Sequence, residues 1–353
     1  MTGISASSYR YFGRTGVQVS PIALGAMNFG DWANNDPDQG IRIVRESLDS
    51  GINIIDTADV YSQGASESIV GEALSGGRRD EVFLATKFHG PMGTAPNRKG
   101  NSRLWLMRAV EESLERLRTD HIDLYQIHKP EDVTDLEETL AALDDLVRSG
   151  KIRYYGTTTF EPHDLVEAQW ISQRRRLHRP VSEQPPYSIL VRGAERATLP
   201  LAQKHGLGVL TWSPLAGGWL SGRHEEGTPT PVSTRLGRQP HRHDPEITVN
   251  QRKRELAIEL GNLAREAGIP LAQLSIAFVL QHPAVSSVLL GPRTLQQLHD
   301  LLPAVDLVLD DSLLDAIDEI VAPGENVSRA DEGYVPSSLT NTLLRRRSVP
   351  RSA

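Results

Sequence analysis

Residues 122–158 read IDLYQIHKPEDVTDLEETLAALDDLVRSGKIRYYGTT and contain the pattern that decides the fold. Two apolar, β-rich runs stand at the ends of this stretch, over residues 122–128 and 152–158. Between them, apolar residues recur at helical spacing over 136–149, and Gly150 marks the end of that helix. A strand, a helix and a second strand in this order predict parallel strands joined by a right-handed crossover.

Six further runs of the same kind make eight predicted strands, and a helical pattern follows seven of the eight. These six cover residues 17–27, 53–57, 82–87, 181–184, 208–213 and 287–290. Eight strand–helix units favour an α/β fold of the closed (β/α)8 type, a TIM barrel, for which about 250 residues are typical before insertions. The alternative is an open, doubly wound sheet. Its Gly-x-Gly-x-x-Gly fingerprint is missing, because Gly25 and Gly30 lack a third partner.

The residues that the barrel does not need are assigned to insertions and ends. A β-hairpin is predicted over 9–19, with its turn at Arg14-Thr15-Gly16, and an extra helix over 271–282. Long loops are predicted over 31–39, 89–101 and 221–248. We therefore expect a single domain over residues 1–353, with a core at about 9–321 and a C-terminal tail at 322–353.

The composition limits the functions that the chain can have. It has 353 residues, 38 Lys and Arg against 45 Asp and Glu, and a net charge of −7, so we expect no nucleic-acid partner. No cysteine occurs, which excludes disulfides, thiolate metal sites and cysteine nucleophiles. No apolar run is long enough for a signal peptide or a membrane span. We expect a cytoplasmic protein with no membrane partner, and a homo-oligomer is compatible with the sequence.

Ionisable side chains stand where three predicted strands end. Asp56, Lys87 and His128 each follow an apolar β pattern, and Tyr61 lies just beyond the first of them. The carboxyl ends of the strands form one face of a barrel, so these side chains are expected to converge. The phenol of tyrosine, with a pKa of about 10, needs a cation such as Lys87 to donate its proton readily. With no activated nucleophile in the set, the pattern favours carbonyl reduction, with hydride from a bound cofactor.

Five stretches carry a resemblance to a known family, the aldo-keto reductases. They are residues 51–61 (GINIIDTADVY), 83–87 (FLATK), 123–128 (DLYQIH), 212–218 (WSPLAGG) and 287–293 (SVLLGPR). Within that family the chain resembles the microbial reductases and potassium-channel β subunits more than the vertebrate aldose reductases. The resemblance implies a barrel that binds NADP(H) and a small-molecule carbonyl substrate. It also implies a catalytic tetrad at Asp56, Tyr61, Lys87 and His128.

The resemblance further implies which residues hold the cofactor. Gln184 would bind the nicotinamide carboxamide, Trp212 would stack on the nicotinamide ring, and Arg293 would meet the 2′-phosphate. Thr159 and Leu301 stand where the family usually has Asn, so we expect weaker cofactor binding than in relatives. The full set of expected cofactor residues is Gly25, Met27, Asp56, Thr158, Gln184, Trp212, Ser213, Leu215, Gly291, Arg293 and Gln297.

Two other functional interpretations stay open. Asp56 and Lys87 could form a structural ion pair, and the chain could be an NADPH-binding regulatory or sensory subunit with negligible turnover. A metal-dependent barrel hydrolase would need several histidines at strand ends, and only His128 stands at one. We therefore favour the reductase and expect no bound metal.

Several smaller features have an ordinary interpretation beside a functional one. His241-Arg242-His243 has the spacing of a metal pair, but it lies in a loop rich in Arg and Pro with no strand before it. Arg345-Arg346-Arg347 fits a solvated chain end better than a nucleic-acid or lipid contact. Three tryptophans fit either a substrate pocket or the core: Trp32, Trp105 and Trp219.

Overall fold

The computed structural model describes residues 3–33, 36–224 and 236–344. Parts of two predicted loops, residues 34–35 and 225–235, lie outside this range, as does Arg345-Arg346-Arg347. Within the described residues no single helix is long and apolar enough to cross a membrane. Two helical segments joined by a sharp bend, Pro240–Glu266 and Leu271–Gln281, pass the same length and composition test only as a pair.

Eight parallel strands close into a barrel, which confirms the predicted (β/α)8 fold. The strands are β3 (Ile22–Gly25), β4 (Ile54–Asp56), β5 (Phe83–Phe88), β6 (Ile122–Ile127), β7 (Ile152–Thr158), β8 (Ser182–Gln184), β9 (Gly208–Thr211) and β10 (Ser287–Leu290). Their order around the barrel is β10-β3-β4-β5-β6-β7-β8-β9. The ring closes where Val288 pairs with Ile22, and both side chains are fully buried.

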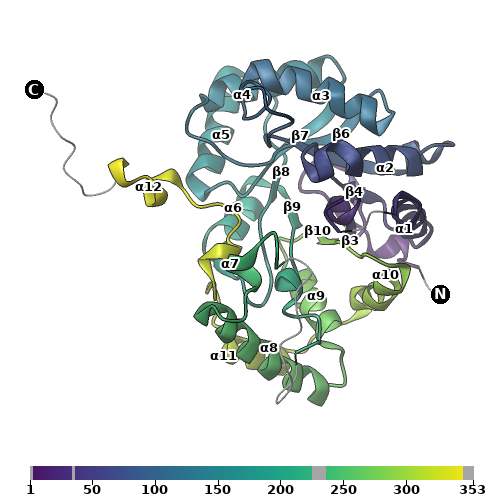
Figure 1. Ribbon diagram of the computed structural model, residues 1–353, viewed down its shortest axis with the longest axis vertical. Coiled ribbons are helices and arrows are strands. Elements are labelled where there is room, and N and C mark those ends of the chain that lie inside the picture. The colour runs from purple at the N-terminus through teal and green to yellow at the C-terminus, as the bar shows by residue number, and fades with distance from the viewer. Residues whose placement is uncertain (1–2, 34–35, 225–235, 345–353) are drawn as a thin grey trace, which may run out of the picture.

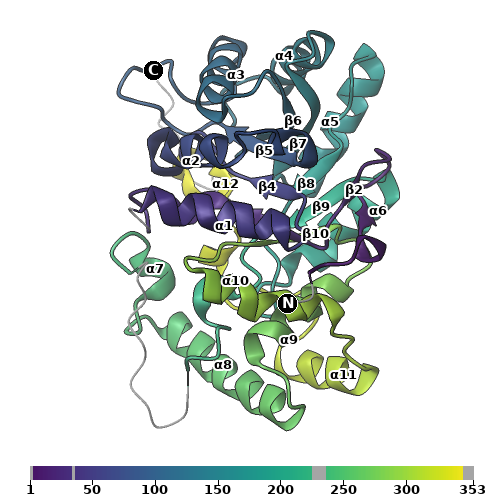
Figure 2. The same cartoon turned by 90° about the vertical axis from the view of Figure 1, so that its right-hand side faces the viewer.

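Helices surround the barrel, as Figures 1 and 2 show. Their bounds are α1 (Pro37–Asp49), α2 (Ala65–Ala73), α3 (Arg103–Leu117), α4 (Leu136–Arg148), α5 (Pro162–Arg175), α6 (Thr198–His205), α7 (Pro240–His243), α8 (Thr248–Glu266), α9 (Leu271–Gln281), α10 (Leu295–Leu301), α11 (Asp311–Ile320) and α12 (Ser337–Thr340). In α4, the Asp135 side chain caps the first turn by accepting a hydrogen bond from the Glu137 backbone N–H, at 2.8 Å. Leu140 and Leu143 then bury the apolar face of this helix against the barrel.

An antiparallel hairpin of β1 (Arg10–Tyr11) and β2 (Gln18–Val19) precedes the barrel, which confirms that prediction. Phe12, between the two strands, is fully buried and packs on Phe83 with 5.3 Å between ring centroids. The single strand predicted over 17–27 is wrong in extent. Pro21 has no N–H to donate to a strand ladder, so β2 ends before it and β3 begins after it.

The predicted extra helix over 271–282 is also wrong in its role, although a helix does form there. α9 contacts β10 directly and buries most of its residues, so it is the crossover helix that leads into the last strand. The additional helix is α8, which packs on α9 and α11. Figure 1 shows α8 and α11 side by side at the bottom of the molecule. The nearly uniform apolar character of α9 is what a helix between the barrel and a second helical layer requires.

The first part of the predicted tail lies against the barrel. The Glu325 carbonyl accepts a hydrogen bond from Arg192 N at 2.8 Å, and Val327 N donates to the Leu190 carbonyl at 3.1 Å. A short 3-10 helix, η8 (Arg329–Asp331), follows at the barrel mouth, where Ala330 and Gly333 line the pocket described below. Residues up to about 333 therefore help to build the mouth, whereas α12 projects from the body in Figure 1. The predicted division into a core and a tail stays a prediction.

Candidate active site

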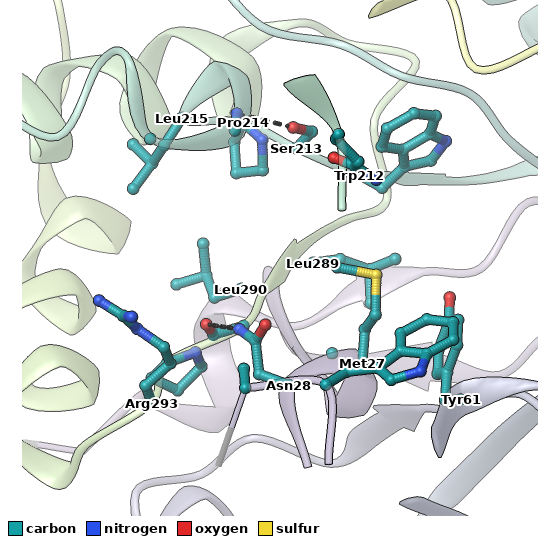
Figure 3. Close-up of a pocket in the computed structure, with 18 of the residues that line it drawn as sticks. Met27, Asn28, Tyr61, Trp212, Ser213, Pro214, Leu215, Leu289, Leu290 and Arg293 are labelled. Atoms are coloured by element: carbon teal, nitrogen blue, oxygen red, sulfur yellow. Dashed lines mark hydrogen bonds between the residues drawn. The ribbon is translucent and has the colours of Figure 1, made fainter. Parts of the chain in front are cut away.

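A pocket of about 1220 Å³ opens at the carboxyl ends of the strands. In Figure 3, Tyr61 lies at one end of the pocket and Arg293 at the other. The segment from Trp212 to Leu215 forms one wall, and Met27, Leu289 and Leu290 form the opposite wall. The cavity is therefore an elongated channel across the barrel mouth, large enough for a dinucleotide together with a small molecule.

Lys87 forms hydrogen bonds with two of the other three residues that were predicted to converge, Asp56 and Tyr61. It is 1% exposed and lies on β5, and its ammonium group donates to the Asp56 carboxylate on the neighbouring strand β4. It also donates to the Thr57 carbonyl at 2.8 Å and to the Tyr61 hydroxyl at 3.4 Å. The three side chains are thus held in one hydrogen-bonded group at the pocket floor.

His128 completes the group from the end of β6. Its ring lies edge-on to the Tyr61 ring, with 5.7 Å between centroids. Burial lowers the pKa of His128 well below its ordinary value, and the charges of Lys87 and Lys129 lower it further. The imidazole is therefore neutral near pH 7, and it can offer either a lone pair or an N–H to a bound molecule.

The pKa of Tyr61 corrects the expected balance of effects. Burial raises it above its ordinary value, and the opposing charge of Lys87 does not outweigh that burial. For Lys87, burial acts to lower the pKa, but Asp56 and Tyr61 together raise it above its ordinary value. The phenol is therefore protonated and the amine charged across the neutral range, so a proton donor and its cation stand side by side.

Each expected cofactor residue lines the pocket. The set is Gly25, Met27, Asp56, Thr158, Gln184, Trp212, Ser213, Leu215, Gly291, Arg293 and Gln297. Thr159 and Leu301, the two positions that differ from the family pattern, line it as well. The structure brings these residues together in one cavity, and their individual roles stay predictions.

The Arg293 end of the pocket is fixed by two amide side chains. Asn28 Nδ2 donates to the Gly291 carbonyl at 2.6 Å, a bond that Figure 3 draws, and Arg293 N donates to Gln297 Oε1 at 2.9 Å. A Cβ on Gly291 would stand 3.0 Å from Asn28 Nδ2, so this close approach favours glycine. Asn28 was not predicted from the sequence, because it lies one residue beyond the strand predicted over 17–27.

A second amide that the sequence analysis missed lies beside the tetrad. Gln126 Nε2 and Gln184 Nε2 each donate to Asp56 Oδ2, both at 2.9 Å. Gln184 therefore supports the tetrad in addition to its expected role toward the cofactor. Gln126 stands two residues before His128 on β6, and strand periodicity places both on the inner face, which is the signal that could have identified it.

The three tryptophans separate into two groups. Trp32 lines the pocket, with 5.7 Å between its ring centroid and that of Tyr61. Trp105 and Trp219 are buried in the hydrophobic core. His241 and Arg242 line the pocket from α7, and the described residues contain no group of three side chains able to hold a metal ion.

Comparisons of the sequence with known proteins find a family model and related proteins. The model described as "Aldo/keto reductase family" matches residues 21–322. An uncharacterized oxidoreductase of Bacillus subtilis, YrpG, is 39% identical over 333 residues, or 91% of this chain and 98% of the relative. A probable voltage-gated potassium channel subunit beta of Arabidopsis thaliana is 33% identical over 320 residues, or 89% and 96%. A putative subunit of the same kind in Schizosaccharomyces pombe is 31% identical over 325 residues, or 89% and 93%.

Proposed function

The chain belongs to the aldo/keto reductase family and is an oxidoreductase, and on that premise we propose that it reduces an aldehyde, ketone or keto-sugar with NADPH. Family members use nicotinamide cofactors, and this chain is expected to use a cofactor of the same class. The observation that carries the proposal is the hydrogen-bonded group of Asp56, Lys87 and Tyr61, at the opposite end of one pocket from Arg293.

The chain's own residues fit such a cofactor. Trp212 offers an aromatic face in the pocket wall, and Arg293 offers a planar guanidinium that can pair with a phosphate through two hydrogen bonds. The channel between them is lined by Met27, Leu289 and Leu290, whose apolar side chains suit the flat faces of nucleoside rings. This combination supports NADPH rather than NADH, because only the former carries a 2′-phosphate for Arg293.

Tyr61 is the proposed proton donor. When bound, NADPH supplies the hydride that adds to the carbonyl carbon, and the carbonyl oxygen gains negative charge as this bond forms. The Tyr61 hydroxyl transfers its proton to that oxygen, and the adjacent Lys87 ammonium, fixed by Asp56, stabilises the phenolate that is left. The neutral imidazole of His128 orients the same oxygen by donating an N–H.

A second candidate is a regulatory or sensory subunit that binds NADPH with negligible turnover. The resemblance to proteins described as potassium channel β subunits favours this possibility in part. The two functions share the same cofactor pocket, so binding alone does not separate them. A measured rate of carbonyl reduction does.

The test is a screen of aldehydes, ketones and keto-sugars that follows NADPH absorbance, with the parent protein and Tyr61→Phe side by side. General acid catalysis contributes about 10²–10⁴-fold, so the variant should lose at least 100-fold in single-turnover hydride transfer while it keeps its NADPH affinity. A near-native rate in Tyr61→Phe would remove Tyr61 from the mechanism. Binding of NADPH without turnover of any compound would favour the regulatory subunit.

A further inference from the structure

Lys129 is a partly buried cation that has no carboxylate partner among the described residues. It follows His128 directly and lines the pocket. Its ammonium group donates to the Gly333 carbonyl and lies 3.5 Å from Thr159 Oγ1, so two neutral oxygens surround it and a third N–H remains for a ligand. Burial lowers the pKa of Lys129 to about 8, with Arg242 lowering it further and Glu183 opposing. Near neutral pH a positive charge therefore stands beside the tetrad without an anion to balance it.

The neighbouring charges add to this excess. Arg242 Nε donates to Asp331 Oδ1 at 2.6 Å, and Lys253 pairs with the other oxygen of the same carboxylate. The single carboxylate of Asp331 therefore forms ion pairs with two buried cations. Glu183 is a carboxyl whose charge acts on Lys129, and burial raises its pKa to about 8. The cluster formed by Lys129, Arg242, Lys253 and Asp331 has a net positive charge.

Lys129 lies on the other side of the barrel mouth from Arg293, where the 2′-phosphate is proposed to bind. Lys129 stands at the end of β6 and Arg293 just beyond β10, and in the closed barrel these two strands are four places apart in either direction. They therefore lie on opposite sides of the mouth. The other carboxylates of the pocket lining besides Asp56 are Asp31, after β3, and Asp300, on α10, and both are on the side of Arg293.

We propose that the substrate carries an anionic group, a carboxylate or a phosphate, and that Lys129 together with Arg242 binds it while the carbonyl oxygen faces Tyr61 and His128. This inference rests on the proposed carbonyl reduction and narrows its substrate class. His128 and Lys129 line the same pocket, and the charge of Lys129 lowers the pKa of His128, so the anionic group lies close to the carbonyl. Anionic carbonyl compounds such as carboxylated aldehydes or sugar phosphates meet that requirement.

The test uses three aldehydes that differ at a single position: 4-formylbenzoate, its methyl ester, and 4-formylphenyl phosphate. With NADPH, kcat/KM of the parent protein should be at least tenfold higher for one or both anions than for the ester, through a lower KM. The preferred anion identifies the group as carboxylate or phosphate. Equal kcat/KM for the ester and both anions would overturn the proposal without any variant.

Substitutions of Lys129 test whether its charge causes the preference for the anionic aldehyde. Lys129→Met should lose at least tenfold more kcat/KM for the preferred anion than for the ester, and Lys129→Arg should keep most of the preference. Lys204→Met removes a charge from an exposed position on α6 and is the matched control, with no expected effect on either substrate. Equal losses for anion and ester in Lys129→Met would overturn the role of Lys129.

Calorimetric titration of the preferred anion into the NADP⁺-loaded protein separates this inference from the proposed function. Binding that weakens at least tenfold in Lys129→Met supports the anion subsite even if turnover is absent, in which case only the reductase proposal fails. Turnover of the ester without any preference for, or tighter binding of, the anions leaves the reductase intact and overturns the subsite.

Discussion

Arg293 is the residue on which the proposed preference for NADPH over NADH depends. Its backbone is held by Gln297, and the preceding Gly291 is held by Asn28, so the side chain projects from a fixed segment. Hydrogen bonds to charged groups contribute about 1.5–3 kcal/mol each, so Arg293→Ala should weaken NADPH at least tenfold. NADH affinity should change little, because it has a hydroxyl at that place. Fluorescence titration of both cofactors measures the difference.

The control for this experiment is Arg252→Ala, which removes an exposed guanidinium on α8 that does not line the channel. It should leave both affinities unchanged. If Arg293→Ala weakened NADH as much as NADPH, Arg293 would not read the 2′-phosphate, and the placement of the adenosine end would be wrong.

Thr159 occupies a backbone conformation that does not suit it. Its φ is +56°, in the left-handed region, where a β-branched residue is strained by about 1–3 kcal/mol. Asn tolerates this region and would restore an amide beside Trp212. We expect Thr159→Asn to raise Tm and to tighten NADPH binding, as measured by calorimetry and thermal unfolding.

Thr159→Gly separates the two effects, because glycine relieves the strain without supplying an amide. It should leave NADPH affinity near that of the parent protein. If Asn and Gly changed the affinity equally, backbone strain rather than the amide would control cofactor binding at this position.

The convergence of the four side chains could be predicted from the sequence because it follows from barrel geometry. Residues at the carboxyl ends of neighbouring parallel strands must meet, and Asp56 and Lys87 do so on β4 and β5. The net rise in the pKa of Tyr61 could not be predicted, because it depends on how completely the surrounding chain removes water from the phenol. The charge excess around Lys129 was also beyond prediction, since Asp331 comes from a segment about 200 residues further along the chain.

Ion pairs of Asp331 hold the short helix η8 against α7 and α8. This carboxylate is 3% exposed and pairs with Arg242 on α7 and the fully buried Lys253 on α8. Removing one partner of a buried ion cluster leaves an uncompensated charge, at a cost of about 3–5 kcal/mol. We therefore expect Asp331→Asn to lower the free energy of unfolding by that amount in urea titration, and to loosen the pocket wall at Gly333.

Asp315→Asn, an exposed carboxylate on α11, is the matched control and should be within experimental error of the parent. A stability of Asp331→Asn equal to that of this control would mean that the cluster contributes nothing to holding η8.

The positions of helices were easier to predict than their roles. Periodicity located α4 to within a residue at each end, since capping and amphipathicity are local properties. Whether α8 or α9 forms the crossover depends on which one contacts β10, and that is a tertiary property. The strand predicted over 17–27 is a different case, because the break at Pro21 is a local property that the sequence itself contains.

The buried Glu183 makes the free energy of unfolding of the whole molecule depend on pH. Burial raises its pKa to about 8 from an ordinary value of 4.5, with Lys129 and the bonds from Thr157 and Phe160 N opposing that rise. Between these two values the folded chain holds more protons than the unfolded one, so this group's contribution to stability falls as pH rises from about 5 to 8. Each pH unit corresponds to about 1.4 kcal/mol, which makes the total several kcal/mol.

Glu183→Gln removes this titration and keeps the shape of the side chain. The difference in unfolding free energy between variant and parent should grow steadily in favour of the variant from pH 5 to pH 8, as measured by urea titration at each pH. His128 titrates in the opposite sense, but it is present in both proteins and cancels from the difference. A difference that does not change with pH would show that Glu183 is already ionised in the folded protein.

The pairing of β3 with β10 has a consequence for how the protein is made. Ile22 and its partner Val288 leave the ribosome far apart in time, on the order of 10–50 s at ordinary rates of translation. Throughout that interval one edge of β3 has no strand partner, and the apolar side chains of β3 lack their final packing. Such an edge can pair with a strand of another chain. The nascent chain thus depends on protection of that edge until the last strand is synthesised, and high-level expression without chaperone capacity should yield insoluble rather than partly active protein.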